Sequence, residues 1–320
     1  MQSGHAPTFS PSLRLPLIAA PMFLVSGIDL VVASCAAGVM GAFPTVNCRS
    51  SDELDRWLSV IRDRLGALGG IIDEGWSHVV PNLVVHPSNP RLSSDLAVLC
   101  RHRPNVVITS VGSPKDVVGP LHDAGVKVWA DVSTLRHAEQ ALACGVDGLV
   151  LLVAGAGGQT GHLNPFAFVR AVRSMYQGTL VLGGGISDGH ALRAAVTLGC
   201  DLGYMGTRFI ATQESMASAA YREMLVRCSA DDVMLTRAFT GLDANMLRPS
   251  IVHAGLDPDQ LAPAPKANVG RDLDPSSEQS PFRRWRDIWS AGHSVSGVKQ
   301  VQSVQSLVDA TVLEFANAPR

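Results

Sequence analysis

The loop from Gly155 to His162 carries the residues of this chain that are best suited to chemistry. Its sequence is GAGGQTGH, in which three glycines fall within four residues. Such a backbone lies flat against a ligand and projects Gln159 and Thr160 toward it. His162 is a candidate acid or base because the unperturbed pKa of histidine lies near neutrality. An ordinary surface histidine is the alternative interpretation of His162.

Two further glycine clusters end apolar stretches farther along the chain. Gly183, Gly184 and Gly185 follow LVL, and the pair Gly206-Thr207 follows LGYM. Glycine lets backbone N–H groups approach an anion without a Cβ in the way, and the last loops of a (β/α)8 barrel commonly bind phosphate. The two clusters therefore predict a site for a phosphate-bearing cofactor, with tight turns as the alternative interpretation.

Residues at the ends of two earlier apolar stretches complete the candidate site. Ala20, Pro21 and Met22 in PLIAAPM would form a wall for a planar ring such as an isoalloxazine. Asn82 in VVPNLVVH is a carboxamide within an apolar stretch, where it must find hydrogen-bond partners. The alternatives are ordinary core packing for Pro21 and Met22 and a buried structural network for Asn82.

Short apolar stretches that alternate with longer amphipathic ones must position these residues. The alternation predicts a parallel sheet with helices outside it. The expected strands are residues 17–20, 38–43, 79–85, 106–109, 126–130, 148–153, 180–184 and 202–205. The expected helices include 51–65, 115–124, 135–144, 165–175 and 189–198, with Ser133 and Asp188 as helix-start residues. We expect an α/β fold, a closed (β/α)8 TIM barrel, because an open doubly wound sheet would usually carry its glycine fingerprint after the first strand.

The sequence pattern changes after the eighth expected strand. Residues 213–282 are expected to form a small helical insertion followed by an exposed linker rich in Pro, Asp and Ser. Residues 1–212 and 283–320 would then form the barrel, which a final amphipathic helix closes from outside. Within the insertion, Thr240, Gly241 and Asn245 are candidates for a lid over the site.

Composition and charge exclude several classes of function. The 320 residues are 46% hydrophobic and 17% charged and include 30 glycines, which fits an α/β enzyme. The net charge of −2 argues against nucleic acid or an anionic membrane surface as a partner. No apolar run reaches the ~18 to 20 residues of a membrane span. The six cysteines form no CxxC pair, so we expect buried free thiols, no metal site and a cytoplasmic protein.

The glycine motifs, in this order, resemble those of the nitronate monooxygenase family, formerly called 2-nitropropane dioxygenases, which are flavin proteins on a (β/α)8 barrel. The resemblance runs from about Leu15 to His293, and AGGQTG (156–161), GGGISDG (183–189) and MGTRFIAT (205–212) carry it. It implies FMN at the carboxyl face of the barrel. The residues implied to contact the phosphate are Gly184, Gly185, Gly206 and Thr207, and those implied near the ring are Ala20, Pro21, Met22, Asn82, Gly157 and Gly158. Asp131 and Gln159 are two further candidates for cofactor contact.

The chain departs from the family pattern at two positions. Gln159 stands where many members carry the histidine that acts as catalytic base, and a carboxamide takes no proton at neutral pH. The resemblance therefore implies oxidation of preformed nitronates, unless His162 or His293 takes the role of the base. Asp131 stands where some relatives carry a flavin-contacting lysine, and Ser133 is a candidate flavin or substrate contact. Residues 285–293 resemble the part of the family that covers the active site. His293 is a candidate for substrate contact, with a solvent-facing cap as the alternative.

Three functions remain open on the sequence. The first is an FMN-dependent oxidoreductase that oxidises a small-molecule alkyl nitronate with O2. The second is an NAD(P)H-dependent flavin reductase that acts on quinones or enoyl thioesters and needs no base at Gln159. The third is a non-enzymatic phosphate- or nucleotide-binding barrel. A sugar-phosphate enzyme is disfavoured because Asp131 is the sole acid that we place at an expected strand end. A homodimer is the assembly to consider.

Overall fold

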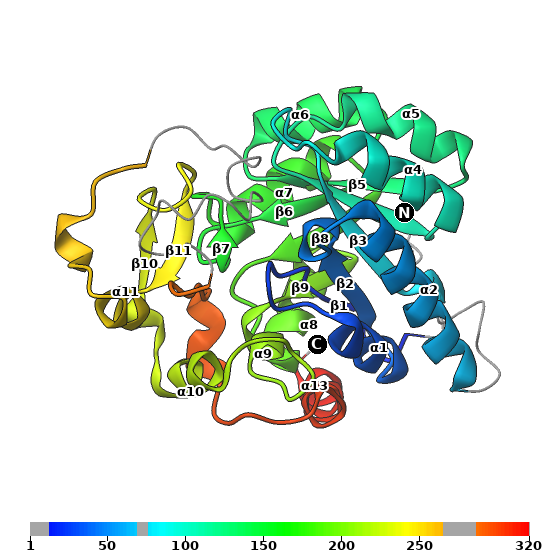
Figure 1. The fold of residues 1–320 in the computed structure, drawn as a ribbon. Helices are drawn as coiled ribbons and strands as arrows, with labels where there is room; N and C mark the ends of the chain where they lie inside the picture. The colour runs from blue at the N-terminus through cyan, green and yellow to red at the C-terminus, as the bar shows by residue number, and fades with distance from the viewer. Residues whose placement is uncertain (1–12, 69–75, 265–285, 320) are drawn as a thin grey trace.

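The computed structural model describes residues 13–68, 76–264 and 286–319, so residues 265–282 of the expected linker lie outside the described chain, as does Trp285. At its centre is a closed barrel of eight parallel strands (Figure 1). The strands are β1 (Leu17–Ala19), β2 (Met40–Pro44), β3 (Val79–Val84), β4 (Val106–Ser110), β5 (Lys127–Val132), β6 (Gly148–Leu152), β8 (Thr179–Gly183) and β9 (Leu202–Met205). All eight expected strands are confirmed, with ends shifted by at most two residues.

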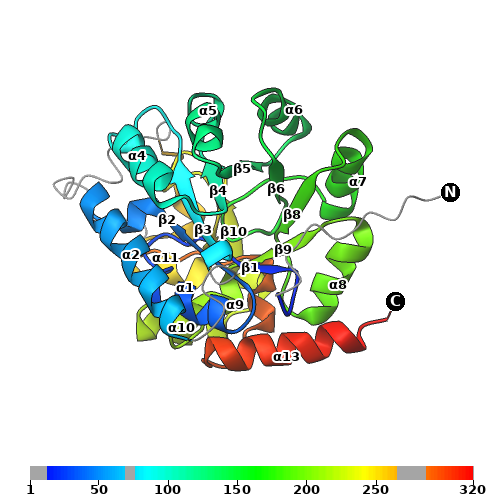
Figure 2. The same cartoon turned by 90° about the vertical axis from the view of Figure 1, so that its right-hand side faces the viewer.

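Helices cover the outer face of the barrel, because each parallel strand must be followed by a crossover to the next (Figure 2). They are α1 (Ile28–Ala36), α2 (Ser51–Ala67), α4 (Leu92–His102), α5 (Lys115–Asp123), α6 (Leu135–Ala143), α7 (Pro165–Met175), α8 (Gly189–Leu198) and α13 (Val304–Asn317). The barrel closes where β9 pairs with β1, with Leu17 opposite Gly203 and Ala19 opposite Met205. The predicted (β/α)8 architecture is therefore confirmed.

Side-chain caps fix where several of these helices begin. The carboxylate of Asp188 accepts a hydrogen bond from the Ala191 N–H at the start of α8, as predicted. The prediction for Ser133 is wrong, because Thr134 is the cap of α6 and accepts from the His137 N–H. Thr134 has the extended backbone that a cap needs, and neighbouring Ser133 instead contacts the His137 ring.

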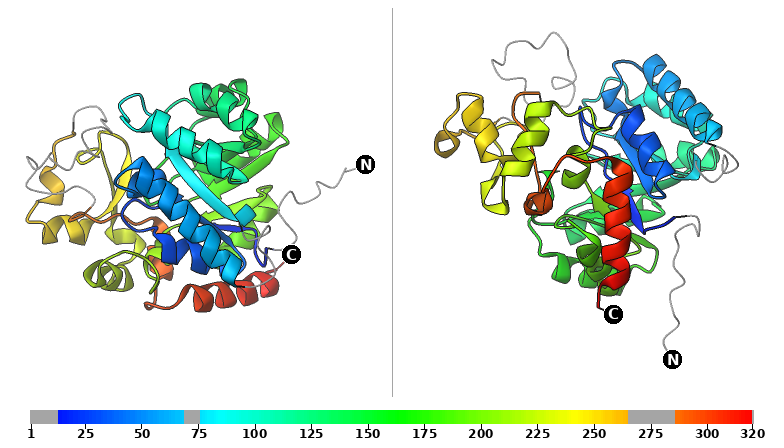
Figure 3. Two further views of the ribbon diagram at one scale, coloured as in Figure 1. Left: turned by 45° about the vertical axis from the view of Figure 1, so that its right-hand side comes forward. Right: turned by 90° about the horizontal axis from the view of Figure 1, so that it is seen from below.

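The C-terminal helix α13 lies between α8 and α1 and completes the ring, as predicted (Figures 2 and 3). Gly189, the first residue of α8, approaches it so closely that a Cβ there would overlap the backbone of Thr311 and Phe315. The Gly189 N–H donates to the Glu314 carboxylate at 2.9 Å, and the Arg193 guanidinium lies 3.9 Å from the Phe315 ring centre. The ring of helices is therefore completed by a helix that follows the excursion beyond β9.

The excursion between β9 and α13 contains helices, as expected, and also two strands that the sequence analysis missed. The helices are α9 (Thr207–Ile210), α10 (Ala219–Arg227) and α11 (Arg248–His253). The strands β10 (Val233–Thr236) and β11 (Ala244–Leu247) are antiparallel, and β11 also pairs with β7 (Gly158–Gln159) from the loop after β6 (Figure 1). Further 3₁₀ turns cover Thr45–Asn47, Ala230–Asp232, Pro258–Gln260 and His293–Gly297. The insertion is thus joined to the barrel through a three-stranded sheet.

The six cysteines are free, as expected. Cys35, Cys48, Cys200 and Cys228 are buried, whereas Cys100 and Cys144 are partly exposed. Burial raises the pKa of the Cys35 thiol to about 12, so this group stays protonated and unreactive at neutral pH. Within the described part of the chain, no helix is both long and apolar enough to cross a membrane.

Candidate active site

A cavity of about 260 Å³ lies at the carboxyl ends of the barrel strands. Each strand contributes a lining residue near its carboxyl end. These residues are Ala20, Pro44, Asn82, Ser110, Asp131, Leu152, Gly183 and Tyr204. Active sites of (β/α)8 barrels lie at this face, because the loops that follow the strands converge there.

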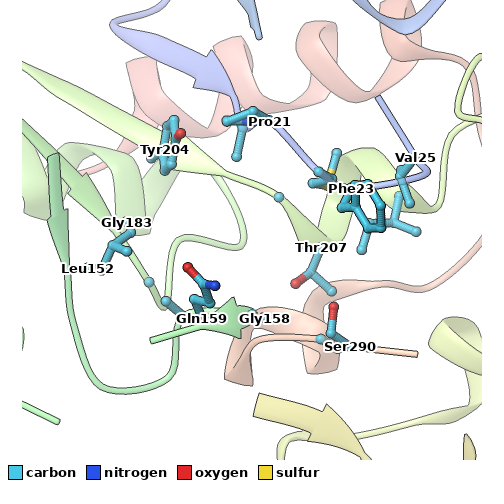
Figure 4. A pocket seen from close by; sticks show the side chains of 18 of the residues that line it. Pro21, Phe23, Val25, Leu152, Gly158, Gln159, Gly183, Tyr204, Thr207 and Ser290 are labelled. Carbon is cyan, nitrogen blue, oxygen red and sulfur yellow. The ribbon is translucent and has the colours of Figure 1, made fainter. Parts of the chain in front are cut away.

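The structure brings together all twelve residues that the sequence nominated for cofactor binding. They line this one cavity and are Ala20, Pro21, Met22, Asn82, Asp131, Gly157, Gly158, Gln159, Gly184, Gly185, Gly206 and Thr207. Four residues were candidates for a part in catalysis or substrate contact, and of these Gln159 lines the cavity, whereas Ser133, His162 and His293 do not. Figure 4 shows the side chains of Gln159 and Thr207 pointing into the same space, below Pro21 and Tyr204 in this view.

The three remaining candidates lie at the periphery of the site. His162 is exposed and lies near Asp243, whose carboxyl has its pKa lowered chiefly by the hydrogen bond from Arg237. The Ser133 hydroxyl is 3.2 Å from Nδ1 of His137 at the start of α6. His293 is exposed and packs against Gly155, whose carbonyl accepts its backbone N–H at 2.9 Å. None of the described residues that line the cavity is a histidine.

The loop after β6 is held in place by the inserted hairpin. The buried Asn245 side chain on β11 donates from Nδ2 to the Ala156 carbonyl at 2.7 Å. The Thr160 hydroxyl donates to the Val153 carbonyl at 2.9 Å, and its backbone N–H donates to the Asp243 carbonyl at 3.1 Å. These bonds fix the backbone on both sides of Gln159. Asn245, nominated as part of a lid, thus contacts the glycine loop directly.

The loops after β8 and β9 form the glycine-rich side of the cavity. Gly184 and Gly185 have φ angles of 133° and 77°, a region that disfavours residues with a Cβ. The Thr207 hydroxyl accepts the Gly292 N–H at 3.0 Å, which leaves its own proton free to be donated into the cavity. Arg208, half-buried, donates to the Ser187 carbonyl at 2.7 Å and so fixes the β8–α8 loop.

The loop after β1 is clamped by Asn47, which the sequence analysis missed. Its Nδ2 donates to the carbonyls of Met22 and Ser26 at 3.0 and 2.8 Å, and its Oδ1 accepts the Leu24 N–H at 2.9 Å. Leu24 has a φ of 58°, which is uncommon for a leucine and is sustained by these bonds. The clamp holds Phe23 on the cavity wall. No local motif around Asn47 indicates this role, because it depends on a contact between two loops.

An aromatic pair that the sequence analysis missed covers the other wall. The rings of Tyr221 and Trp289 stack with their centres 5.0 Å apart, and both residues line the cavity. The Tyr221 hydroxyl donates to the Ser290 carbonyl, and the backbone N–H of Trp289 donates to the Ser250 hydroxyl at 2.9 Å. The described part of the 285–293 segment therefore covers the cavity, as the family resemblance implied.

Two polar side chains on the floor of the cavity have a buried atom without a hydrogen-bond partner among the described residues. They are Asp131, through Oδ1, and Tyr204, through its hydroxyl. Burial raises the pKa of the Asp131 carboxyl to about 8, so this group is mainly neutral at pH 7. Burial, and to a lesser extent the nearby Asp131, raise the pKa of the Tyr204 phenol well above its usual value. By contrast, the carboxamide oxygen of Asn82 accepts the Ser110 hydroxyl at 3.0 Å.

The geometry suits a ligand with a flat ring and an anionic group. Apolar and aromatic side chains form the walls, glycine-rich loops offer backbone N–H groups on one side, and the floor carries partnerless polar atoms. Among the described lining residues there is no Lys, Arg or His, so these residues offer neither a permanent cation nor an imidazole base. Any proton abstraction from a neutral substrate would lack an evident acceptor.

The fold and site define a (β/α)8-barrel enzyme with a cofactor-sized cavity at its carboxyl face. Residues 76–313 match the nitronate monooxygenase family, and the chain therefore belongs to this family of oxidoreductases, as its motifs predicted. The chain is 28% identical over 284 residues to a nitronate monooxygenase of Paraburkholderia phytofirmans, with 78% of each chain covered.

Solved structures agree with the observed fold. The nitroalkane oxidase of Streptomyces ansochromogenes superposes with a TM-score of 0.77 at 23% identity, covering 96% of this chain and 97% of that one. FabK of Thermotoga maritima superposes with a TM-score of 0.76 at 22% identity, covering 95% of this chain and 93% of that one. At such identities the likeness concerns the barrel and its embellishments.

Proposed function

We propose that this protein is an FMN-dependent monooxygenase that oxidises small alkyl nitronates with O2. The observation that carries the proposal is the convergence of all twelve nominated cofactor contacts on one cavity, in a chain of the nitronate monooxygenase family. A bound flavin would accept electrons from the nitronate and pass them to O2. The protein's own residues bind and orient the two partners and limit the access of water.

The residues of the cavity fit FMN. The backbone N–H groups at Gly184, Gly185 and Gly206 and the Thr207 hydroxyl would hold the phosphate, since the left-handed backbone at the first two admits no bulky side chain. Pro21 and the residues that flank it would form the wall against the ring. The partnerless atoms of the cavity floor offer hydrogen bonds to a polar ring edge.

Gln159 directs the proposal toward preformed nitronates rather than neutral nitroalkanes. Its carboxamide lines the cavity where many family members have a base, and it can donate to an anionic nitro group but cannot take a proton from carbon. His162 and His293 are exposed and outside the cavity, so neither replaces that base in this conformation.

The cavity favours this oxygenase over a reductase that uses NAD(P)H or acts on enoyl thioesters. The phosphates of a nicotinamide dinucleotide or of a coenzyme thioester are usually met by Arg or Lys. No described residue of either type lines the cavity. Instead, the space beyond the glycine-rich loops is bounded by Phe23, Val25, Tyr221, Ile288 and Trp289, which suits a short alkyl group.

Oxygen consumption by the purified protein tests the proposal. We expect a yellow protein with FMN bound, which consumes O2 with propyl-2-nitronate and much more slowly with neutral 2-nitropropane. Anaerobic NADH or NADPH should leave the flavin oxidised. A protein that neither retains nor takes up FMN would refute the proposal, and rapid bleaching by NADPH without oxidation of nitronate would support the reductase.

A further inference from the structure

Asp131, which is half-buried, and Tyr204, which is buried, each carry a buried polar atom that the fold does not explain. They project from β5 and β9, on well-separated strands of the barrel, and both line the same cavity. Oδ1 of Asp131 and the hydroxyl of Tyr204 are buried, and each lacks a partner among the described residues. Since a buried polar group without a partner is costly, such a pair points to a ligand that supplies the missing bonds.

The surroundings of the pair favour its neutral form. Below it, the barrel interior is apolar, with Val106, Ile108, Trp129 and Val150 packed in one cluster with Tyr204. The described titratable side chains that line the cavity are Asp131, Tyr204 and Tyr221, and the hydroxyl of Tyr221 is bonded to Ser290. No described cation faces the carboxyl group, and a buried carboxylate without a cation takes up a proton instead.

We propose that Asp131 and Tyr204 form a neutral donor pair, in which the carboxyl O–H and the phenol O–H are donated to an electron-rich edge of the bound ligand. Two ligand groups have this chemistry, namely the polar edge of the flavin ring and the oxygens of the anionic nitronate. The inference rests on the proposed function. Some relatives carry a lysine at this position. The protonated Asp131 would donate a hydrogen bond as a lysine does, but it would bring no positive charge.

Ionisation of Asp131 would abolish the donor and place a negative charge against an electron-rich ligand. The raised pKa of this carboxyl, about 8, sets the range in which the change occurs. Below this pH the carboxyl donates, and above it the carboxylate repels. The affinity for the ligand is therefore predicted to fall as the pH rises above about 8, approaching about tenfold per pH unit if only the protonated protein binds.

Three proteins test this donor pair: the wild type, Asp131→Asn and Tyr204→Phe. The Asn side chain is nearly the same size and keeps a donor, but it does not ionise. The Phe side chain keeps the packing and loses the hydroxyl. Melting temperatures and far-UV circular dichroism identify any variant that fails to fold, and the pH profile of the wild type alone provides a second measurement that needs no variant.

Two binding measurements distinguish the two ligand sources. In the first, FMN is titrated into apoprotein at pH values from about 7 to 10, above the second pKa of its phosphate, which is about 6. In the second, the FMN-loaded protein is mixed anaerobically with increasing propyl-2-nitronate, and bleaching of the flavin gives the apparent dissociation constant. The Asp131→Asn protein experiences the same ionisations of FMN and nitronate, so the ratio of wild type to variant isolates Asp131.

A loss of affinity above pH 8 that is seen in the wild type and absent in Asp131→Asn supports the inference. If it occurs with FMN alone, the donors serve the flavin ring, and if it occurs only with nitronate, they serve the substrate. Tyr204→Phe should lower the affinity for the same ligand several-fold at every pH. Equal pH profiles for wild type and Asp131→Asn in both measurements, with FMN bound, overturn the inference and leave the proposed function standing. Failure to bind FMN at any pH refutes the proposed function itself.

Discussion

Gln159 is the residue at which this chain parts from the chemistry that its family resemblance implies. It lies on β7 and lines the cavity, with its backbone fixed by pairing to Ala244 on β11. A different side chain substituted at this position would therefore still face the cavity. None of the described lining residues is a histidine, so no second imidazole among them stands in for the one that many family members carry.

Gln159→His is expected to create activity toward neutral nitroalkanes. A neutral imidazole at this position can take the proton from carbon, and general-base catalysis contributes roughly 10²- to 10⁴-fold when well placed, so we expect a gain of at least about tenfold. The kcat/KM with preformed nitronate should change little. Gln159→Leu, which adds no base, is the matched control. An equal gain in both variants, or none in the histidine variant, would contradict the assigned position of Gln159.

Asp131 is expected to make the stability of the apoprotein depend on pH. Its pKa is raised by burial from 3.8 to about 8, so between these values the unfolded chain has lost the proton that the folded chain keeps. The unfolded state then binds fewer protons, and the free energy of unfolding falls as the pH rises from about 4 to 8. Asp131→Asn removes this dependence. The free energy of unfolding of this variant should exceed that of the wild type increasingly toward pH 8, by up to about 5 kcal/mol. Melting temperatures measured against pH follow this difference. Parallel melting curves of the two proteins would disprove the raised pKa of Asp131.

At the scale of elements, the hairpin β10–β11 acts as a support for the glycine loop. Asn245→Ala removes the donor to the Ala156 carbonyl and leaves that buried oxygen unpaired, which costs about 1–3 kcal/mol of stability. The loosened loop should also raise the KM for nitronate. Leu235 lies opposite Asn245 in the hairpin and is 53% exposed, so Leu235→Ala is the control and should change stability by less than about 0.5 kcal/mol. Similar losses in both variants would mean that the bond to Ala156 is not the cause.

The sequence predicted the barrel but not this hairpin, and the difference is physical. Buried parallel strands are apolar runs set off by glycine and by amphipathic helices, so eight of them were visible in the residues alone. The strands β10 and β11 have four residues each and exist through pairing with one another and with β7, which is far away in the sequence. Local patterns carry no record of such a contact.

The predicted site residues also differ physically from the missed ones. The glycines and Asn82 departed from what an ordinary strand end requires, and so they were found. Tyr204 sits in a strand where an aromatic residue normally signals core packing, and only the barrel register shows that it reaches the cavity. His162 and His293 were nominated by residue type, but the direction of their side chains depends on loop geometry that sequence reasoning does not supply.

At the scale of the whole molecule, the barrel depends on the return of α13 to its place between α8 and α1. Gly189→Ala should destabilise the protein by at least about 1–3 kcal/mol, because the new Cβ would overlap the backbone of α13. The same change at Gly119, on α5, is the control. Apart from its chain neighbours and the backbone of its own helix, no described atom lies within 4 Å of the added Cβ, and the crowding by Pro120 offsets the helix propensity of alanine, so the free energy of unfolding should change by less than about 1 kcal/mol. Urea denaturation measures both. Equal effects of the two substitutions would contradict the close packing of α8 against α13.

In the proposed function, the cavity at the carboxyl face holds FMN and brings an alkyl nitronate to it. The most direct measurement is the absorbance of the FMN-loaded protein after anaerobic mixing with propyl-2-nitronate, followed by admission of O2. We expect the yellow band of the flavin to bleach on mixing and to return when O2 is admitted. A flavin that is bound but stays oxidised in the presence of nitronate would refute this function.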